Sequence, residues 1–290
     1  MAKEPNSKDA NIGKLLLLDN KNKFVDALAL TQRYLQHRDD LQMRLLNLHF
    51  LLLNSKFKEA QSEYDALPKV VLERPLVKGF LAQLQLNDKK PELAIENGLV
   101  AYNSSSSLRN LIVLVSAYTQ LGQTANSIAL LEEHLEKQPN DQAARMLLAE
   151  KNIGTDVTSA IAQYEQAVAQ NPNNYIAFNN LAYLHLKAGQ LKKAKEYGEQ
   201  AVSLQPDNSA ALDTLARVLF TDREFDKALE LYERAITDAM KNEEIYLNYV
   251  ETLLAAEKTF LATRKLKQRE MKEPVSIQRV AELKAKYQLK

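Results

Sequence analysis

The sequence contains no cysteine, no tryptophan and only seven glycines among its 290 residues. The absence of cysteine excludes disulfides, thiolate zinc sites, iron–sulfur clusters and cysteine nucleophiles. So few glycines argue against glycine-rich phosphate-binding loops and against an architecture of strands and tight turns. Runs of apolar residues are also short, and none approaches the length of about 20 residues that is needed to span a bilayer. We therefore expect no integral membrane segment in this chain.

Positively and negatively charged residues are nearly balanced. Lys and Arg total 38 and Asp and Glu total 37, which gives a net charge of +1. The chain as a whole is therefore not drawn to nucleic acid, and we expect no nucleic-acid partner. Residues 258–290 differ, because they carry ten Lys or Arg and three Glu. Aromatic residues are not interleaved with these cations, so we interpret the segment as the solvated face of a last helix. Docking to an acidic partner, to anionic lipid or to nucleic acid is the alternative.

Motifs for catalysis or metal binding are missing. The glycines stand singly, so neither dinucleotide-binding nor P-loop spacing occurs. The four histidines have no compact metal-ligand spacing. His134 and His185 fall at positions that we expect to pack in the core, and the adjacent carboxylates Glu243 and Glu244 are expected at the surface. We predict that the protein is not an enzyme and has no cofactor and no bound metal.

What the sequence does contain is a period of 33 or 34 residues. A small residue recurs at this spacing: Ala27, Ala60, Ala94, Ser127, Ala160, Ala194, Ala228 and Ala262. Twelve residues before each of these lies an apolar column: Leu15, Leu48, Ala82, Val115, Leu148, Ala182, Ala216 and Val250. A fixed period over nearly the whole chain indicates a repeat architecture.

Each repeat has the apolar spacing of two helices, at offsets of three, four and seven residues. The expected repeat starts are near residues 8, 41, 75, 108, 141, 175, 209 and 243. Pro139, Pro172 and Pro206 end second helices, and the Asn or Asp residues that follow are turn and N-cap residues for the next helix. The small residues let the paired helices approach closely, and stacking of the pairs buries one core.

This pattern resembles the tetratricopeptide repeat family. Residues 209–240 carry it best, through Leu212, Leu215, Ala216, Leu219, Phe225, Ala228, Tyr232 and Ala235. Two departures are the missing Trp and the glycines Gly98 and Gly198 at a position usually held by a large residue. The resemblance implies an all-α, right-handed superhelical solenoid of about eight helix-turn-helix repeats over residues 8–274. A disordered stretch, 1–7, would precede it and a capping helix, 275–290, would follow.

The resemblance also implies a concave groove that binds a peptide or a partner protein. Repeat positions 2, 5, 9, 12 and 13 would face it. The candidate partner-binding residues are Arg145, Asn152, Asn179, Tyr183, Lys187, Asp213 and Arg217. Asn179 suits a peptide backbone, and Arg145 or Arg217 suits a carboxylate. The carboxylate clamp known in this family is not expected, because Ala149, Ala210 and Thr214 stand at three of its places.

Residues 173–220 are further similar to the repeats of bacterial exosortase/PEP-CTERM-system lipoproteins, through the phrases FNNLAYL and LDTLARVLF. This similarity implies a periplasm-facing envelope protein of which the chain is a soluble fragment. The predicted function is a non-catalytic scaffold for assembly of a bacterial envelope complex. An accessory module that handles polymer in exopolysaccharide export or protein sorting is the alternative, and an enzyme is the less favoured one. The partner, the compartment and the oligomeric state are left open.

Overall fold

The computed structural model describes residues 7–236 and 242–289. Over these residues the chain forms 18 helices and no strand, so the predicted all-α fold class is confirmed. The predicted disordered stretch 1–7 lies outside the described residues, except for Ser7. The Ser7 hydroxyl accepts a hydrogen bond from the Ala10 backbone N–H and caps the first helix.

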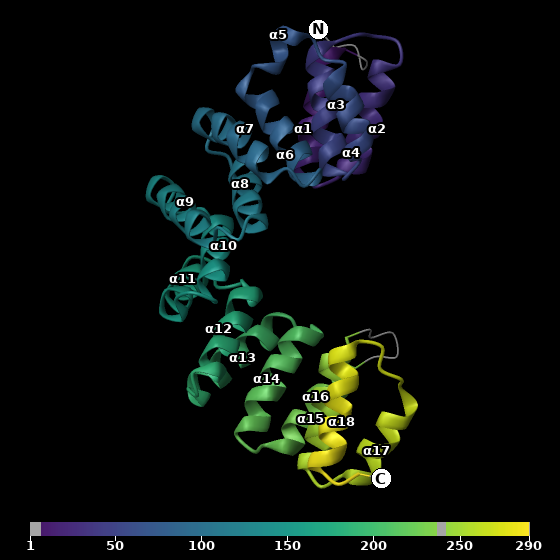
Figure 1. The fold of residues 1–290 in the computed structure, drawn as a ribbon, viewed down its shortest axis with the longest axis vertical. Helices are drawn as coiled ribbons and strands as arrows, with labels where there is room; N and C mark the ends of the chain where they lie inside the picture. Colours follow the sequence, from purple (N-terminus) through teal and green to yellow (C-terminus); the bar gives the residue numbers. More distant parts are fainter. Residues whose placement is uncertain (1–6, 237–241, 290) are drawn as a thin grey trace. The chain divides into compact units, whose positions relative to one another are not determined.

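The helices group into two compact units, Met1–Pro139 and Asn140–Lys290 (Figure 1). The first unit holds α1 (Lys8–Asn20), α2 (Phe24–Leu35), α3 (Leu41–Leu53), α4 (Phe57–Asp65), α5 (Lys69–Leu72), α6 (Pro75–Asn87), α7 (Pro91–Ser104), α8 (Leu108–Gln120) and α9 (Thr124–Lys137). The second holds α10 (Gln142–Asn152), α11 (Val157–Gln170), α12 (Tyr175–Lys187), α13 (Leu191–Leu204), α14 (Ser209–Thr221), α15 (Phe225–Ala235), α16 (Glu243–Ala255), α17 (Thr259–Gln268) and α18 (Pro274–Lys286). Within each unit the helices pack in successive pairs.

The column of small residues marks where the two helices of a pair cross. Each member lies three residues after the start of a second helix, and all eight have an exposed fraction of 0%. In one pair the Ser127 hydroxyl donates to the Val115 carbonyl at 3.4 Å, which joins the small column directly to the apolar column. The close crossing predicted from the repeat is therefore confirmed, because the space beside these Cβ atoms is already filled.

The helix starts in the second unit follow from capping residues. Asp141, Asn174 and Asn208 each accept a hydrogen bond from a backbone N–H in the first turn of the helix that follows. These bonds satisfy donors that a helix start leaves unpaired. The prediction that these Asn and Asp residues are N-caps is confirmed.

Gly98 and Gly198 make room for leucines of the next repeat. A Cβ at Gly98 would lie 2.9 Å from Leu114 Cδ2, and a Cβ at Gly198 would lie 3.0 Å from Leu215 Cδ1. At these two positions a glycine replaces the large residue of the family pattern. A leucine from the next helix fills the volume that the large side chain would occupy.

Two features were not predicted correctly. The short helix α5 has no counterpart in the repeat pattern, and its Val71 is 1% exposed in the core of the first unit. Glu243 was expected at the surface but is buried, with an exposed fraction of 6%. Its carboxylate accepts backbone N–H bonds from Lys272 at 2.8 Å and Glu273 at 3.1 Å. It therefore holds the segment that leads into α18, the last helix, which packs beside α16 (Figure 1).

Candidate functional site

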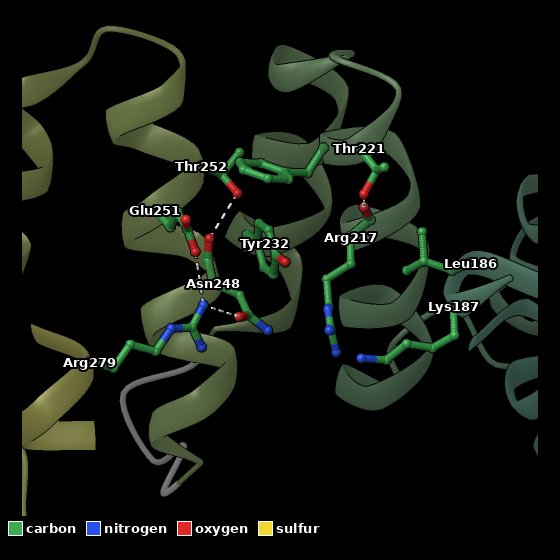
Figure 2. A pocket seen from close by; sticks show the side chains of 10 residues that line it. Leu186, Lys187, Arg217, Thr221, Tyr232, Asn248, Glu251, Thr252 and Arg279 are labelled. Atoms are coloured by element: carbon green, nitrogen blue, oxygen red, sulfur yellow. Dashed lines mark hydrogen bonds and ion pairs between the residues drawn. The ribbon is translucent and has the colours of Figure 1, made fainter. Parts of the chain in front are cut away.

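A pocket of about 340 Å³ opens on the first helices of the last repeats in the second unit. Five helices contribute to it: α12, α14, α15, α16 and α18 (Figure 2). Its lining consists of Leu186, Lys187, Arg217, Phe220, Thr221, Tyr232, Asn248, Glu251, Thr252 and Arg279. First helices that stand side by side in a repeat stack present equivalent faces to one continuous surface, which explains why residues about 34 positions apart meet here.

Two buried titratable side chains belong to this site: Tyr232 is part of the lining, and Asp213 is bonded to the lining residue Asn248. Asp213 is 8% exposed and accepts a hydrogen bond from Asn248 Nδ2 at 2.7 Å. Burial raises the pKa of Asp213, while the hydrogen bond from Asn248 and the charge of Arg217 act in the opposite direction. Burial also raises the pKa of the Tyr232 hydroxyl, and the neighbouring Asp213 charge adds to this.

The raised pKa of Asp213 gives a pH-dependent stability with a definite sign. The folded chain keeps the proton to a higher pH than the unfolded chain, whose carboxyl has the ordinary value of 3.8. The stability contribution is therefore complete below the unfolded pKa and is lost as the pH rises through the folded pKa. Asp213→Asn should remove this loss, as measured by urea unfolding at a series of pH values above 3.8. A wild-type-to-variant difference that stays constant with pH would contradict this account.

Arg279 of α18 ties the last helix to α16. Its Nη2 donates to Asn248 Oδ1 at 2.7 Å and to Glu251 Oε2 at 3.0 Å (Figure 2). Lys286 Nζ lies 2.9 Å from Glu251 Oε1. Burial alone would raise the pKa of Glu251, but the hydrogen bonds from Lys286 and Arg279 outweigh it and lower the pKa. Glu251 is therefore ionised at neutral pH, with both carboxylate oxygens occupied.

Lys187 and Arg217 differ from Arg279, because their charges are poorly compensated. Figure 2 shows the two side chains extending toward each other. The Lys187 ammonium lies 5.6 Å from the centre of the Tyr183 ring, and within the described part of the chain it forms no ion pair. Arg217 Nη1 lies 3.9 Å from Glu244 Oε1, whose side chain is 66% exposed. An exposed pair at this distance contributes little, so both cations remain available to a ligand.

The apolar part of the lining comes from Leu186 and Phe220, supplemented by two threonines. Thr221 Oγ1 donates to the Arg217 carbonyl and Thr252 Oγ1 donates to the Asn248 carbonyl, both at 2.8 Å. Because both O–H groups are donated to carbonyls of their own helices, these hydroxyls offer a ligand only an acceptor oxygen. The pocket thus combines a cationic pair with a partly apolar wall.

The structure brings together some of the predicted partner-binding residues. Lys187 and Arg217 line the pocket, whereas Asp213 is outside the lining and accepts a hydrogen bond from the lining residue Asn248. Tyr183 lies under the Lys187 ammonium. Asn179, on the same helix, is partly buried, and its Oδ1 is enclosed without a hydrogen-bond partner among the described residues.

The two predicted residues of α10 are not in the pocket. Arg145 is 6% exposed, and its Nη1 bonds Gln163 Oε1 at 2.8 Å and also Gln166 Oε1. Asn152 is 4% exposed. Their side chains pack within the first repeat of this unit, so the prediction of one surface that contains all seven residues stays a prediction.

Sequence reasoning missed Asn248, Glu251 and Arg279, although part of the signal was present. Glu251 stands at repeat position 9 counted from Glu243, the position that Arg217 holds one repeat earlier. Asn248 follows Tyr232 by 16 residues, the spacing at which Asn180 Nδ2 bonds the Tyr164 hydroxyl at 2.9 Å. Arg279 has no such signal, because its partners come from another helix.

His134 and His185 have structural roles. His134 is fully buried and its Nδ1 is 2.8 Å from the Tyr102 hydroxyl. His185 is 2% exposed, bonds Gln190 Oε1 through Nδ1 at 2.6 Å and stacks on Tyr197. The prediction that both pack in the core is confirmed. Within residues 7–236 and 242–289, no cluster of His, Asp and Glu is arranged to hold a metal ion. In the same ranges no helix combines the length and apolarity needed to cross a membrane.

The tetratricopeptide repeat family model matches residues 155–209 and 184–243. No curated protein matches the chain. Among solved structures, the chain is similar to the APC/C hetero-tetramer Cut9–Hcn1, with a TM-score of 0.61 and 13% identity over 98% of this chain and 57% of that chain.

The chain is also similar to MamA. One crystal structure of MamA protein aligns with a TM-score of 0.50 and 17% identity, over 64% of this chain and 94% of that chain. MamA 41-end from Desulfovibrio magneticus RS-1 aligns with a TM-score of 0.50 and 16% identity, over 55% and 90%. At such identities the likeness concerns the fold alone. The family match confirms tetratricopeptide repeats over residues 155–243, and the structural likeness confirms the all-α solenoid fold.

Proposed function

We propose that the chain is a non-catalytic scaffold that binds a peptide or a partner protein on the inner face formed by α12, α14 and α16. The observation that supports this most is the placement of Lys187 and Arg217. They come from successive first helices and line the same pocket. Lys187 forms no ion pair among the described residues, and Arg217 has a 3.9 Å contact with exposed Glu244 besides the charge of buried Asp213. Cations with little compensating charge, next to apolar side chains, are typical of a surface that binds a partner.

The internal contacts of the pocket fit recognition better than chemistry. Asp213, Asn248, Glu251 and Arg279 are bonded to one another. A network of this kind fixes side chains in place, whereas a general acid or base must be free to reach a substrate. Tetratricopeptide folds are typically non-catalytic scaffolds, which agrees with this assignment. The proposal includes a role in assembling a bacterial envelope complex, for which the phrases FNNLAYL and LDTLARVLF are the support. Polymer handling stays a prediction.

Affinity capture from cells of the native host tests this function. The wild-type chain is compared with Arg217→Glu and with Lys193→Glu, which reverses one charge at an exposed site on the second helix α13. We expect a partner to bind the wild type and the Lys193 variant and to be lost from the Arg217 variant. Thermal unfolding of the Lys193 variant should match the wild type. For the Arg217 variant, whose charge also acts on Asp213, circular dichroism is needed to show that the variant is folded when the partner is lost. A partner retained by the Arg217 variant would move the interaction to another face.

A further inference from the structure

The charges of the pocket in the second unit restrict the partner that it fits. Lys187, Arg217 and Arg279 bring three cations to the lining, against one lining carboxylate, Glu251. Glu251 is fully engaged by Arg279 and Lys286, so it does not neutralise the other two cations. Buried Asp213, which is not part of the lining, interacts with the charge of Arg217, so Lys187 carries the least compensated positive charge of the lining. Figure 2 shows the Lys187 and Arg217 side chains converging.

The carboxylate of Glu244 lies near the guanidinium of Arg217. This carboxylate is 66% exposed, yet one oxygen lies 3.9 Å from Arg217 Nη1. This separation is longer than a hydrogen bond, so the guanidinium fork of Arg217 lacks the bidentate contact with a carboxylate that its geometry favours. A carboxylate supplied by a partner can make this contact and at the same time reach the Lys187 ammonium.

The adjoining wall sets a second requirement. Leu186 and Phe220 are partly exposed beside the cations, and the hydroxyls of Thr221 and Thr252 are bonded to their own helices. The partner residue next to the bound carboxylate therefore contacts apolar surface. Binding is tighter when that residue is apolar itself, because apolar area is then buried on both sides.

We infer that this pocket recognises an acidic segment of a partner, in which an internal Asp or Glu lies between Lys187 and Arg217 and an adjacent bulky apolar residue packs on Leu186 and Phe220. The inference rests on the proposed function and specifies the partner's chemistry. The site uses Lys187 and Arg217, neither of which is one of the carboxylate-clamp places that Ala149, Ala210 and Thr214 hold.

Binding to defined peptides tests this. The probes are acetylated and amidated ten-residue peptides that differ only at two adjacent central positions: Asp-Phe, Asn-Phe and Asp-Ser. Amidation removes the terminal carboxylate, so only an internal acid can bind. By fluorescence anisotropy with the full chain, Asp-Phe is expected to bind at least about tenfold more tightly than either other probe. Its affinity should fall as salt is raised, because exposed charges are screened.

Variants locate the binding. Lys187→Gln and Arg217→Gln should each reduce the preference for Asp-Phe over Asn-Phe, whereas Lys193→Gln, on the outer helix α13, should leave it unchanged. Circular dichroism confirms that each variant is folded. A preference for the acid that survives in both Lys187→Gln and Arg217→Gln would overturn the inference.

The outcomes separate this inference from the proposed function. If Asn-Phe binds as well as Asp-Phe and binding of both is lost in Phe220→Ser, then the face binds peptides but the requirement for an acid is wrong. If the wild type binds none of the probes, the acidic specificity is wrong. The proposed function is tested separately by affinity capture from the native host. If the captured partner does not depend on Arg217, the proposed function is contradicted too.

Discussion

Ala194→Leu is expected to lower the free energy of unfolding by about 1–3 kcal/mol. Ala194 lies at the crossing of α12 and α13 and is 0% exposed, as is Ala182 of the apolar column. Three added carbon atoms have no space at this crossing, so the helices must separate or the leucine must adopt a strained rotamer. Urea unfolding followed by circular dichroism measures the loss.

The matched control is Ala162→Leu. Ala162 lies on the second helix α11 of the preceding repeat, and it is exposed. The same change in volume there should leave the urea midpoint nearly unchanged. Equal midpoints for wild type and Ala194→Leu would show that the small column does not mark tight crossings and would remove the basis of the repeat register.

A second large effect concerns pH and the first unit. Burial, followed by the nearby charge of Arg109, lowers the pKa of His49 from its ordinary 6.5 to about 4, although Asp19 acts in the opposite direction. The unfolded chain therefore takes up a proton near pH 6.5, and the folded chain does so only near pH 4. The stability contribution is complete above 6.5 and is lost as the pH falls toward 4. A shift of this size corresponds to on the order of 3 kcal/mol.

Two measurements check this prediction. The His49 ring resonances in NMR spectra should not change as the pH is lowered from neutral through 6.5, and an imidazole that titrates near 6.5 would contradict the burial argument. His49→Gln should remove the corresponding part of the acid destabilisation seen by urea unfolding. His37→Gln, at an exposed site, is the control and should leave the pH profile in place.

Much of the fold could be predicted because its determinants are local. The small column, the prolines and the capping residues each act within one helix pair, and the structure places Ala194 at a crossing and Asn174 at a helix start. The exceptions involve partners distant in the sequence. Glu243 is buried because the backbone of Lys272 and Glu273 folds over its carboxylate. No pattern around Glu243 itself indicates this.

Only part of the candidate site could be predicted from the sequence. Repeat positions were sufficient to place Lys187 and Arg217 on one face. They were not sufficient for Arg145, whose guanidinium is held by Gln163 and Gln166 of the adjacent helix. Nor could they reveal the bond between Arg279 and Asn248, since it depends on how the last helix packs on α16.

Site-specific photocrosslinking in cells of the native host tests the central claim, that a partner binds on the inner face of the second unit. A benzophenone amino acid replaces Thr221, which lines the pocket and is exposed, or Lys193, which is exposed on the outer helix α13. The account predicts a discrete protein adduct from position 221 and none from position 193. Adducts from position 193 alone would contradict it.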